Sequence, residues 1–259
     1  MRLEETLRDA RSGGRPLLVP YVTGGLYDGW TELLEAVVAA GADAVEIGIP
    51  FSDPVMDGPT IQTASQQALA RGATPMTILG DVEGLAVGAP LAVMTYANLV
   101  MHAGYDRFAS ALVDAGVDAA ILPDLPLDEF GPWGSAADAA GIETVLLAAP
   151  TTTDERLARI CERSKGFVYA VSLLGVTGER GSLSEPSSTV GERCRGLTDT
   201  PVLLGVGIST PEQAAEAVRH ADGVVIGSAL IRRLLDGGGV DVAADFIREV
   251  RRALDETAS

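Results

Sequence analysis

The sequence predicts an α/β protein built as a single (β/α)8 barrel, the TIM-barrel architecture, with an extra N-terminal helix. Four observations support this prediction. Short apolar segments alternate with amphipathic segments, the apolar segments number eight, and no linker interrupts the alternation. The length of 259 residues is also close to the roughly 250 residues typical of such barrels. We therefore expect one domain over residues 1–259.

The eight apolar segments are the predicted strands. Aromatic residues make up only 5% of the chain, so the core must be built from Val, Leu, Ile and Ala, which suits a layered α/β interior. The strands are expected within residues 16–22, 44–50, 90–97, 119–126, 143–150, 166–174, 201–207 and 223–230.

The segments between the strands have the periodicity of amphipathic helices. In residues 28–41, Leu33, Leu34, Val37 and Val38 fall on one face. Glycine residues end several of these helices. The same spacing recurs in residues 105–116, 154–164 and 241–254.

Residues 1–16 have the pattern of a short acidic helix that ends at a Gly-Gly pair. This helix lies outside the strand–helix repeat, and we expect it to cover the bottom of the barrel. An open doubly wound sheet is the alternative fold. Such a sheet usually carries a GxGxxG motif after its first strand, and residues 19–29, VPYVTGGLYDG, do not match it.

The composition excludes several functions. The net charge is −17, and a chain this acidic is a poor binder of nucleic acid, because phosphate contacts need Lys and Arg. Two cysteines, Cys161 and Cys194, are too few for a secreted disulfide framework. The N-terminus lacks the apolar run that a signal peptide would need. The sequence also contains no run of about 18 apolar residues, so we expect no membrane span. We expect a cytoplasmic protein with reduced thiols.

A carboxylate interrupts the second predicted strand at Glu46, in the segment AVEIGIP. Active sites of such barrels lie at the carboxyl ends of the strands. If Val45, Ile47 and Ile49 face the helices, Glu46 faces the interior, where the loss of water should raise its pKa. It could then act as a general acid or base near neutral pH. The alternative is a structural acid paired with an arginine across the barrel.

A second acid, Asp57, follows in the loop FSDPVMDGP. Pro54 and Pro59 frame this acid and stiffen the loop, because proline fixes φ. The alternative is a turn aspartate, since Asp-Gly is a common turn pair. Two acids from one strand and its following loop favour a joint catalytic role.

Glycines at the ends of the last two strands indicate a phosphate site. Glycine lets backbone N–H groups approach a ligand, and the loops after strands 7 and 8 often bind phosphate in barrels. Tight packing at the strand ends is the alternative. The Gly/Ser loop of residues 175–188 would add Gly178 and act as a lid. The other candidates are Gly205, Gly207, Gly227 and Ser228.

Metal and Schiff-base chemistry are not expected. His102 and His220 lie far apart, and no His/Cys cluster offers a metal site. Lys165, the only lysine, precedes the sixth strand and therefore belongs at the bottom of the barrel. Cleavage of a carbon–carbon bond would have to rely on carboxylates.

Several motifs resemble the tryptophan synthase alpha subunit family. They are VEIGIPFSDPVMDGPTIQ, MTYANLV, LPDLPLDE, SLLGVTGERGSL, GVGISTPEQ and VIGSAL, and they occur in this order between residues 16 and 235. The resemblance implies a carbon–carbon lyase of L-tryptophan biosynthesis. Its reaction would be the retro-aldol cleavage of indole-3-glycerol phosphate to indole and glyceraldehyde 3-phosphate.

The resemblance also implies roles for single residues. Glu46 matches the acid/base residue of the family, Asp57 the partner of the indole nitrogen, and Tyr169 the tyrosine beside the catalytic glutamate. The other substrate-binding positions are Tyr21 and Tyr96 near the indole, Thr177 in the lid, and Gly178, Gly205, Gly207, Gly227 and Ser228 in the phosphate cup.

The resemblance further implies a tryptophan synthase beta subunit as partner, in an α2β2 heterotetramer. Pyridoxal phosphate is expected only in that partner, and no cofactor is expected in this chain. The main alternative is a stand-alone indole-3-glycerol-phosphate lyase that releases free indole. A non-catalytic barrel would be expected to lack Glu46 or Asp57, and an isomerase barrel would carry a different acid/base set.

Overall fold

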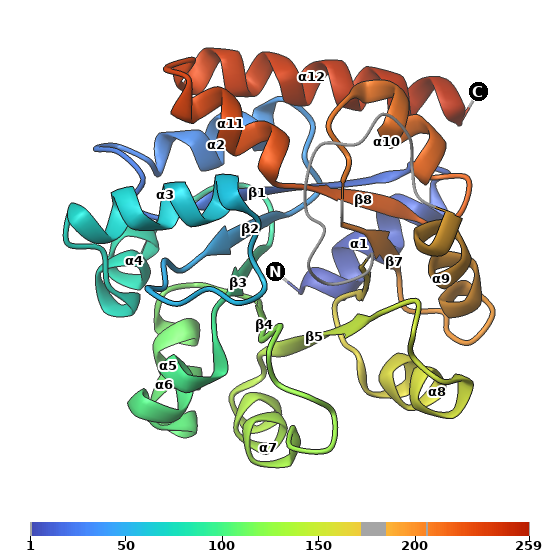
Figure 1. Cartoon of the computed structure of the whole chain (residues 1–259), viewed down its shortest axis with the longest axis horizontal. Helices are drawn as coiled ribbons and strands as arrows, with labels where there is room; N and C mark the ends of the chain where they lie inside the picture. Colours follow the sequence, from blue (N-terminus) through green and yellow to red (C-terminus); the bar gives the residue numbers. More distant parts are fainter. Residues whose placement is uncertain (1, 172–184, 206, 259) are drawn as a thin grey trace.

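The chain forms a closed barrel of parallel strands in the computed structural model, which describes residues 2–171, 185–205 and 207–258 (Figure 1). The strands are β1 Leu17–Thr23, β2 Val45–Gly48, β3 Leu91–Met94, β4 Ala119–Ile121, β5 Glu143–Ala148, β6 Val168–Ala170, β7 Val202–Leu204 and β8 Gly223–Ile226. They pair in chain order, and β8 returns to pair with β1. The predicted barrel is confirmed, because each edge strand of an open sheet would pair on one side only.

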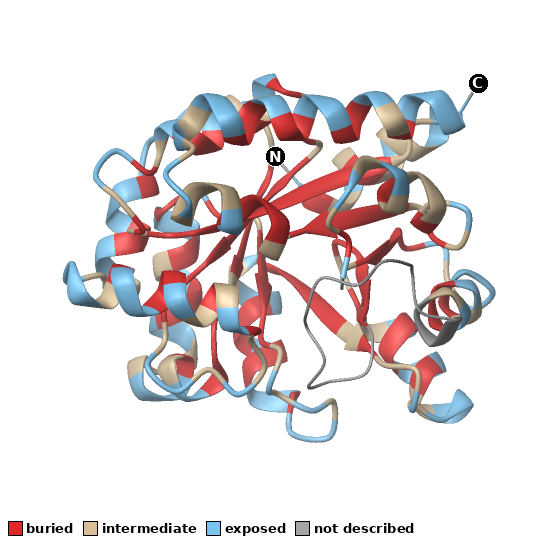
Figure 2. Ribbon diagram, turned by 45° about the horizontal axis from the view of Figure 1, so that its top comes forward, coloured by how far each residue is buried: buried red, intermediate tan, exposed pale blue. Residues whose placement is uncertain are grey.

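Helices surround the barrel (Figure 1). In the described residues they are α1 Leu3–Ser12, α2 Glu32–Ala39, α3 Pro59–Ala70, α4 Pro75–Val82, α5 Ala97–Ala103, α6 Tyr105–Asp114, α7 Gly131–Ala140, α8 Asp154–Arg163, α9 Glu185–Arg195, α10 Pro211–Ala217, α11 Ser228–Leu235 and α12 Gly239–Thr257. Their buried faces point toward the barrel and their exposed faces point outward (Figure 2). No helix within the described ranges is long and apolar enough to cross a membrane.

Three loops contain more helix than the periodicity of the sequence predicts. Two helices follow each of β2, β3 and β8 instead of one. Between α3 and α4, Gly72 adopts a φ of +90°, which ends the first helix, and Thr74 caps the second with its side chain. Of the added helices, α5 and α11 begin directly after the carboxyl ends of β3 and β8, whereas α3 begins only after the loop that contains Asp57.

Alternate residues of each strand face two different apolar layers. Val45 and Ile47 of β2 belong to the layer between the barrel and the helices, as predicted. Residues of the opposite parity face the barrel interior, where Leu17, Ala92 and Val145 pack together. Since Glu46 lies between Val45 and Ile47, it faces the interior.

Helix α1 covers the bottom of the barrel, as predicted. Leu3 and Leu7 are fully buried and join the interior layer next to Leu17, the first residue of β1. The backbone N–H of Glu4 donates to Oε2 of Glu143, the first residue of β5, at 2.8 Å. Each fully buried leucine contributes about 1.5–3 kcal/mol. This helix closes the amino-terminal end, so a ligand can reach the interior only from the carboxyl-terminal end.

Candidate active site

Glu46 is fully buried in the barrel interior, opposite Tyr21 of β1 in the strand register. Neither of its carboxyl oxygens has a hydrogen-bond partner among the described residues. Burial raises the pKa of Glu46 to about 8, and the charge of Asp57 adds to this rise. The nearby hydroxyl group of Tyr169 acts against this rise in the pKa of Glu46, although it does not reach hydrogen-bond geometry with either carboxyl oxygen. The alternative, in which Glu46 pairs with an arginine across the barrel, is wrong, because no described arginine contacts its carboxyl oxygens.

Two tyrosines lie close to Glu46, and each packs against a glycine: Tyr21 against Gly48 of β2, and Tyr169 against Gly205, directly after β7. A Cβ atom at Gly48 would lie 1.9 Å from the hydroxyl oxygen of Tyr21, and a Cβ atom at Gly205 would lie 1.8 Å from Cε2 of Tyr169. Both tyrosines are buried, and burial is the main reason that the pKa of each phenol is raised. The phenol groups therefore stay neutral and can act only as hydrogen-bonding and packing groups at ordinary pH.

Asp57 lies in the loop after β2, and Tyr96 holds its side chain. The Tyr96 hydroxyl donates to Oδ2 of Asp57 at 3.1 Å and accepts from the Met56 backbone N–H at 3.0 Å. Burial raises the pKa of Asp57, and the bond from Tyr96 opposes that rise. Phe51 packs against Tyr96 with ring centroids 4.8 Å apart. The carboxylate is therefore bound by the residue that precedes α5, a contact that a simple turn aspartate does not require.

A residue that the sequence reasoning missed supports the same loop. Gln62, in the first turn of α3, donates from its side-chain amide to the backbone carbonyl of Asp57 at 2.8 Å. No polarity or spacing signal distinguishes Gln62 from the other glutamines of α3. Its contact depends on how the loop turns back onto the helix, which only the tertiary structure defines.

The candidates for the phosphate end divide into two groups. Gly227 precedes α11 and Ser228 begins it, so both lie at a helix N-terminus, which favours an anion. Gly207 has a φ of +80° and open space where a side chain would be. Gly205, in contrast, makes room for the Tyr169 ring. For Gly205, the alternative of tight packing at a strand end is therefore supported. Thr177 and Gly178 lie outside the described residues.

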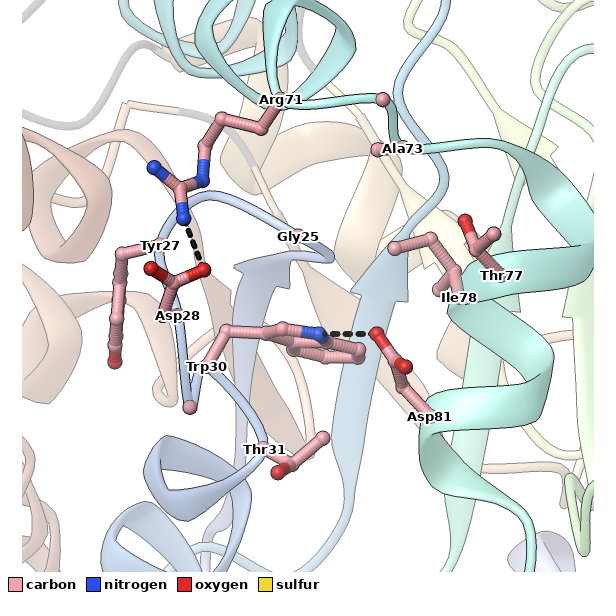
Figure 3. A pocket seen from close by; sticks show the side chains of 12 residues that line it. Gly25, Tyr27, Asp28, Trp30, Thr31, Arg71, Ala73, Thr77, Ile78 and Asp81 are labelled. Atoms are coloured by element: carbon pink, nitrogen blue, oxygen red, sulfur yellow. Dashed lines mark hydrogen bonds and ion pairs between the residues drawn. The ribbon is translucent and has the colours of Figure 1, made fainter.

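A separate crevice of about 420 Å³ lies between the β1–α2 loop and the joint of α3 and α4 (Figure 3). Arg71 pairs with Asp28 across it, and Trp30 donates from Nε1 to Asp81 at 2.9 Å. Neither Glu46 nor any other candidate site residue lines this crevice. It therefore lies outside the carboxylate site.

No group of three or more His, Cys, Asp and Glu side chains able to hold a metal ion occurs in the part of the chain that the structure describes. The fold and the site thus define a (β/α)8-barrel protein with two carboxyl groups, those of Glu46 and Asp57, at the carboxyl-terminal end of its strands.

Comparison with known proteins identifies the family. The family model described as tryptophan synthase alpha chain matches residues 7–256. The tryptophan synthase alpha chain of Thermobifida fusca is 44% identical over 253 residues, which cover 95% of this chain and 94% of that protein. The alpha chain of Streptomyces coelicolor is 43% identical over 261 residues, covering 96% of each chain.

Solved structures agree. A chain in a structure of Mycobacterium tuberculosis tryptophan synthase superposes with a TM-score of 0.91, at 37% identity and with 98% of both chains covered. The alpha subunit of Legionella pneumophila superposes with a TM-score of 0.88 at 31% identity, and the match covers 98% of each chain. The chain belongs to the tryptophan synthase alpha chain family.

The chain is accordingly a carbon–carbon lyase that cleaves indole-3-glycerol phosphate in tryptophan biosynthesis. The alpha chain family carries no cofactor, and pyridoxal phosphate belongs to the beta subunit.

Proposed function

We propose that Glu46 and Asp57 perform the retro-aldol cleavage of indole-3-glycerol phosphate. The observation that supports this most is the buried Glu46 carboxyl group, which lacks a hydrogen-bond partner in the described residues and has a pKa raised to about 8. A group with this pKa is mostly protonated at pH 7, so it can give a proton to carbon C3 of the indole ring.

Protonation of C3 makes the ring a sink for the electrons of the bond that must break. The positive charge develops on N1, where the Asp57 carboxylate would stabilise it and take up the N–H proton. The Glu46 carboxylate left by the first step then removes the proton of the glycerol hydroxyl group. The carbon–carbon bond breaks as the aldehyde forms, its electrons return to the ring, and N1 takes its proton back from Asp57 to give neutral indole. Each assisted proton transfer is typically worth about 10²–10⁴-fold.

The test is the variant Glu46→Gln, which keeps the shape of the side chain and removes its proton transfer. We expect no indole release while the circular dichroism spectrum stays native. Glu143→Gln is the matched control, because Glu143 is the second buried strand acid among the described residues and lies at the bottom of the barrel. Near-normal turnover by a folded Glu46→Gln variant would remove Glu46 from the mechanism.

We also propose that backbone N–H groups hold the phosphate group near Gly178, Gly207, Gly227 and Ser228, with Thr177 in the lid. The N-terminus of α11 supports this, as does the open space at Gly207. Tyr21, Tyr96 and Tyr169 would line the indole end. A crystal soaked with a phosphate analogue should show it beside Gly207 and Ser228, and density at an arginine cluster would contradict the proposal.

The proposed partner is a tryptophan synthase beta subunit in an α2β2 assembly, which the solved tryptophan synthase relatives support. Val55 in the loop before Asp57 is 81% exposed, and Met101 in α5 is 60% exposed. Tyr96 precedes α5 and bonds that loop at Met56, so both apolar side chains belong to neighbouring segments of the active-site end. Exposed apolar groups of this kind suit a protein partner.

The rate of indole release should rise when a beta subunit is added. If the chain alone releases indole fast and the rate does not change when a beta subunit is added, the result would favour the stand-alone indole-3-glycerol-phosphate lyase instead.

We also propose a cytoplasmic location and a single domain over residues 1–259. The biosynthetic family supports the location, and the closed barrel supports the single domain.

A further inference from the structure

We propose that Gln62 is a positioning residue for the cleavage reaction, because its side chain holds the backbone of Asp57 from the helix that follows. This inference rests on the proposed role of Asp57. Gln62 does not act on the substrate itself.

The bond from Gln62 is not an ordinary part of a helix terminus. The groups that lack partners at the N-terminus of a helix are backbone N–H donors, and capping side chains therefore accept hydrogen bonds. The Gln62 side chain instead donates, from Nε2 to the Asp57 carbonyl at 2.8 Å. The backbone N–H of Gln62 already bonds to the carbonyl of Gly58 at 3.0 Å. The side-chain bond thus satisfies the loop and not the helix.

The position of Asp57 depends on two such anchors. On one side, the Met56 N–H donates to the Tyr96 hydroxyl at 3.0 Å; on the other, the Asp57 carbonyl accepts from Gln62. Tyr96, between β3 and α5, therefore fixes the Val55–Met56 peptide group, and Gln62 of α3 fixes the Asp57–Gly58 peptide group, which directly follows the Asp57 Cα. Without the Gln62 bond, the Asp57–Gly58 peptide group can turn, and the Asp57 Cα and its carboxylate can shift with it.

Helix α3 is a firm support for this anchor. Ile61 and Ala64 are buried against Tyr21 and Ile231. Both ends of the helix are also tied to other elements. At its start, Arg232 of α11 donates to the Thr60 hydroxyl at 2.7 Å, and after its last turn Arg71 pairs with Asp28 of the β1–α2 loop (Figure 3).

The expected effect follows from geometry. A displacement of a reacting group by about 1 Å can cost about 10²-fold in rate. Gln62→Ala removes the bond without changing the chemical identity of the carboxylates, the phosphate end or the aromatic side chains of the site. We expect kcat for indole release to fall by roughly 10- to 100-fold, with KM changed by less than about threefold.

The matched control is Gln66→Ala, the same substitution one turn further along α3 at an exposed position. It tests whether any glutamine of this helix matters through helix stability alone. We expect Gln66→Ala to keep the kcat of the unaltered chain. Gln62→Asn, whose amide is one methylene shorter, should behave like Gln62→Ala, because it cannot span the same distance.

The experiment measures indole release by the full chain for Gln62→Ala, Asp57→Asn and the double variant. If Gln62 acts through Asp57, its substitution should lower kcat by less than about threefold in the Asp57→Asn background. An equal loss in both backgrounds would overturn the inference, as would a Gln62→Ala variant within twofold of the unaltered kcat. If Asp57→Asn is itself fast, the proposed role of Asp57 fails, which is a different result from a slow Asp57→Asn beside a fast Gln62→Ala.

Discussion

The Tyr96 hydroxyl group donates a hydrogen bond to Oδ2 of Asp57 at 3.1 Å. The hydroxyl oxygen of Tyr96 also accepts a hydrogen bond from the backbone N–H of Met56, so the phenol proton is directed toward the carboxylate. A donor on a carboxylate stabilises its ionised form and lowers its pKa. Tyr96 thus counteracts the burial that raises the pKa of Asp57.

Tyr96→Phe should therefore slow indole release by about tenfold and shift the acid limb of the pH–rate profile upward. The sign follows from the lost bond: without it the pKa of Asp57 rises, so the ionised form is lost at a higher pH. Steady-state rates between pH 5 and 8 measure this shift. Tyr105→Phe, on α6, removes a phenol hydroxyl elsewhere and should leave the profile unchanged; an unshifted acid limb in Tyr96→Phe would contradict the proposed bond.

Asp57→Asn should slow indole release as severely as Asp57→Ala. Asparagine keeps hydrogen-bonding capacity but loses the negative charge that would stabilise N1 of the protonated indole. The measurement is kcat for both variants under saturating substrate. A nearly normal Asp57→Asn beside an inactive Asp57→Ala would show that hydrogen bonding, and not charge, is the contribution of this side chain.

Glu46→Gln should make the protein inactive and more stable. The folded-state pKa of Glu46 is raised from 4.5 to about 8, so the folded state holds this proton more tightly than the unfolded chain. Its contribution to the free energy of unfolding is fully present below pH 4.5 and is lost as the pH rises toward about 8. Glutamine does not ionise, so the variant escapes this loss.

The difference between Glu46→Gln and the unaltered chain should grow between pH 5 and pH 8 and reach up to roughly 4 kcal/mol. Urea unfolding at several pH values measures it. Parallel curves for the two proteins across this range would mean that the pKa of Glu46 is not raised in the folded state.

Gly205→Ala should lower both stability and indole release. The new methyl group would meet the Tyr169 ring at 1.8 Å and displace it from its place beside Glu46. Gly80→Ala in α4 is the contrasting variant: nothing lies within 4 Å of that position, so alanine should stabilise the helix by about 0.5–1 kcal/mol. Thermal unfolding of both variants and their kcat values test the pair. An active, stable Gly205→Ala would mean that Tyr169 can shift without consequence.

The sequence by itself determined the barrel and the place of its central acid. Eight apolar segments that alternate with amphipathic segments are compatible with few other folds. Side chains of a strand point alternately to its two faces, so the apolar neighbours of Glu46 were enough to predict that Glu46 faces the interior. The N-terminal helix was equally predictable, because it stands outside the repeat and one end of the barrel needs a cover.

Only the tertiary structure decided how the acids are held. Gly205 looks like a phosphate glycine in the sequence, yet it makes room for Tyr169, a neighbour across the β6–β7 pair. The bonds from Tyr96 and Gln62 to Asp57 join residues on different elements, and their reach depends on how the loop folds back. A periodic pattern reports which way a side chain points from its own element. It carries no information about the distance to a side chain on another element, and that distance decides whether two groups form a bond.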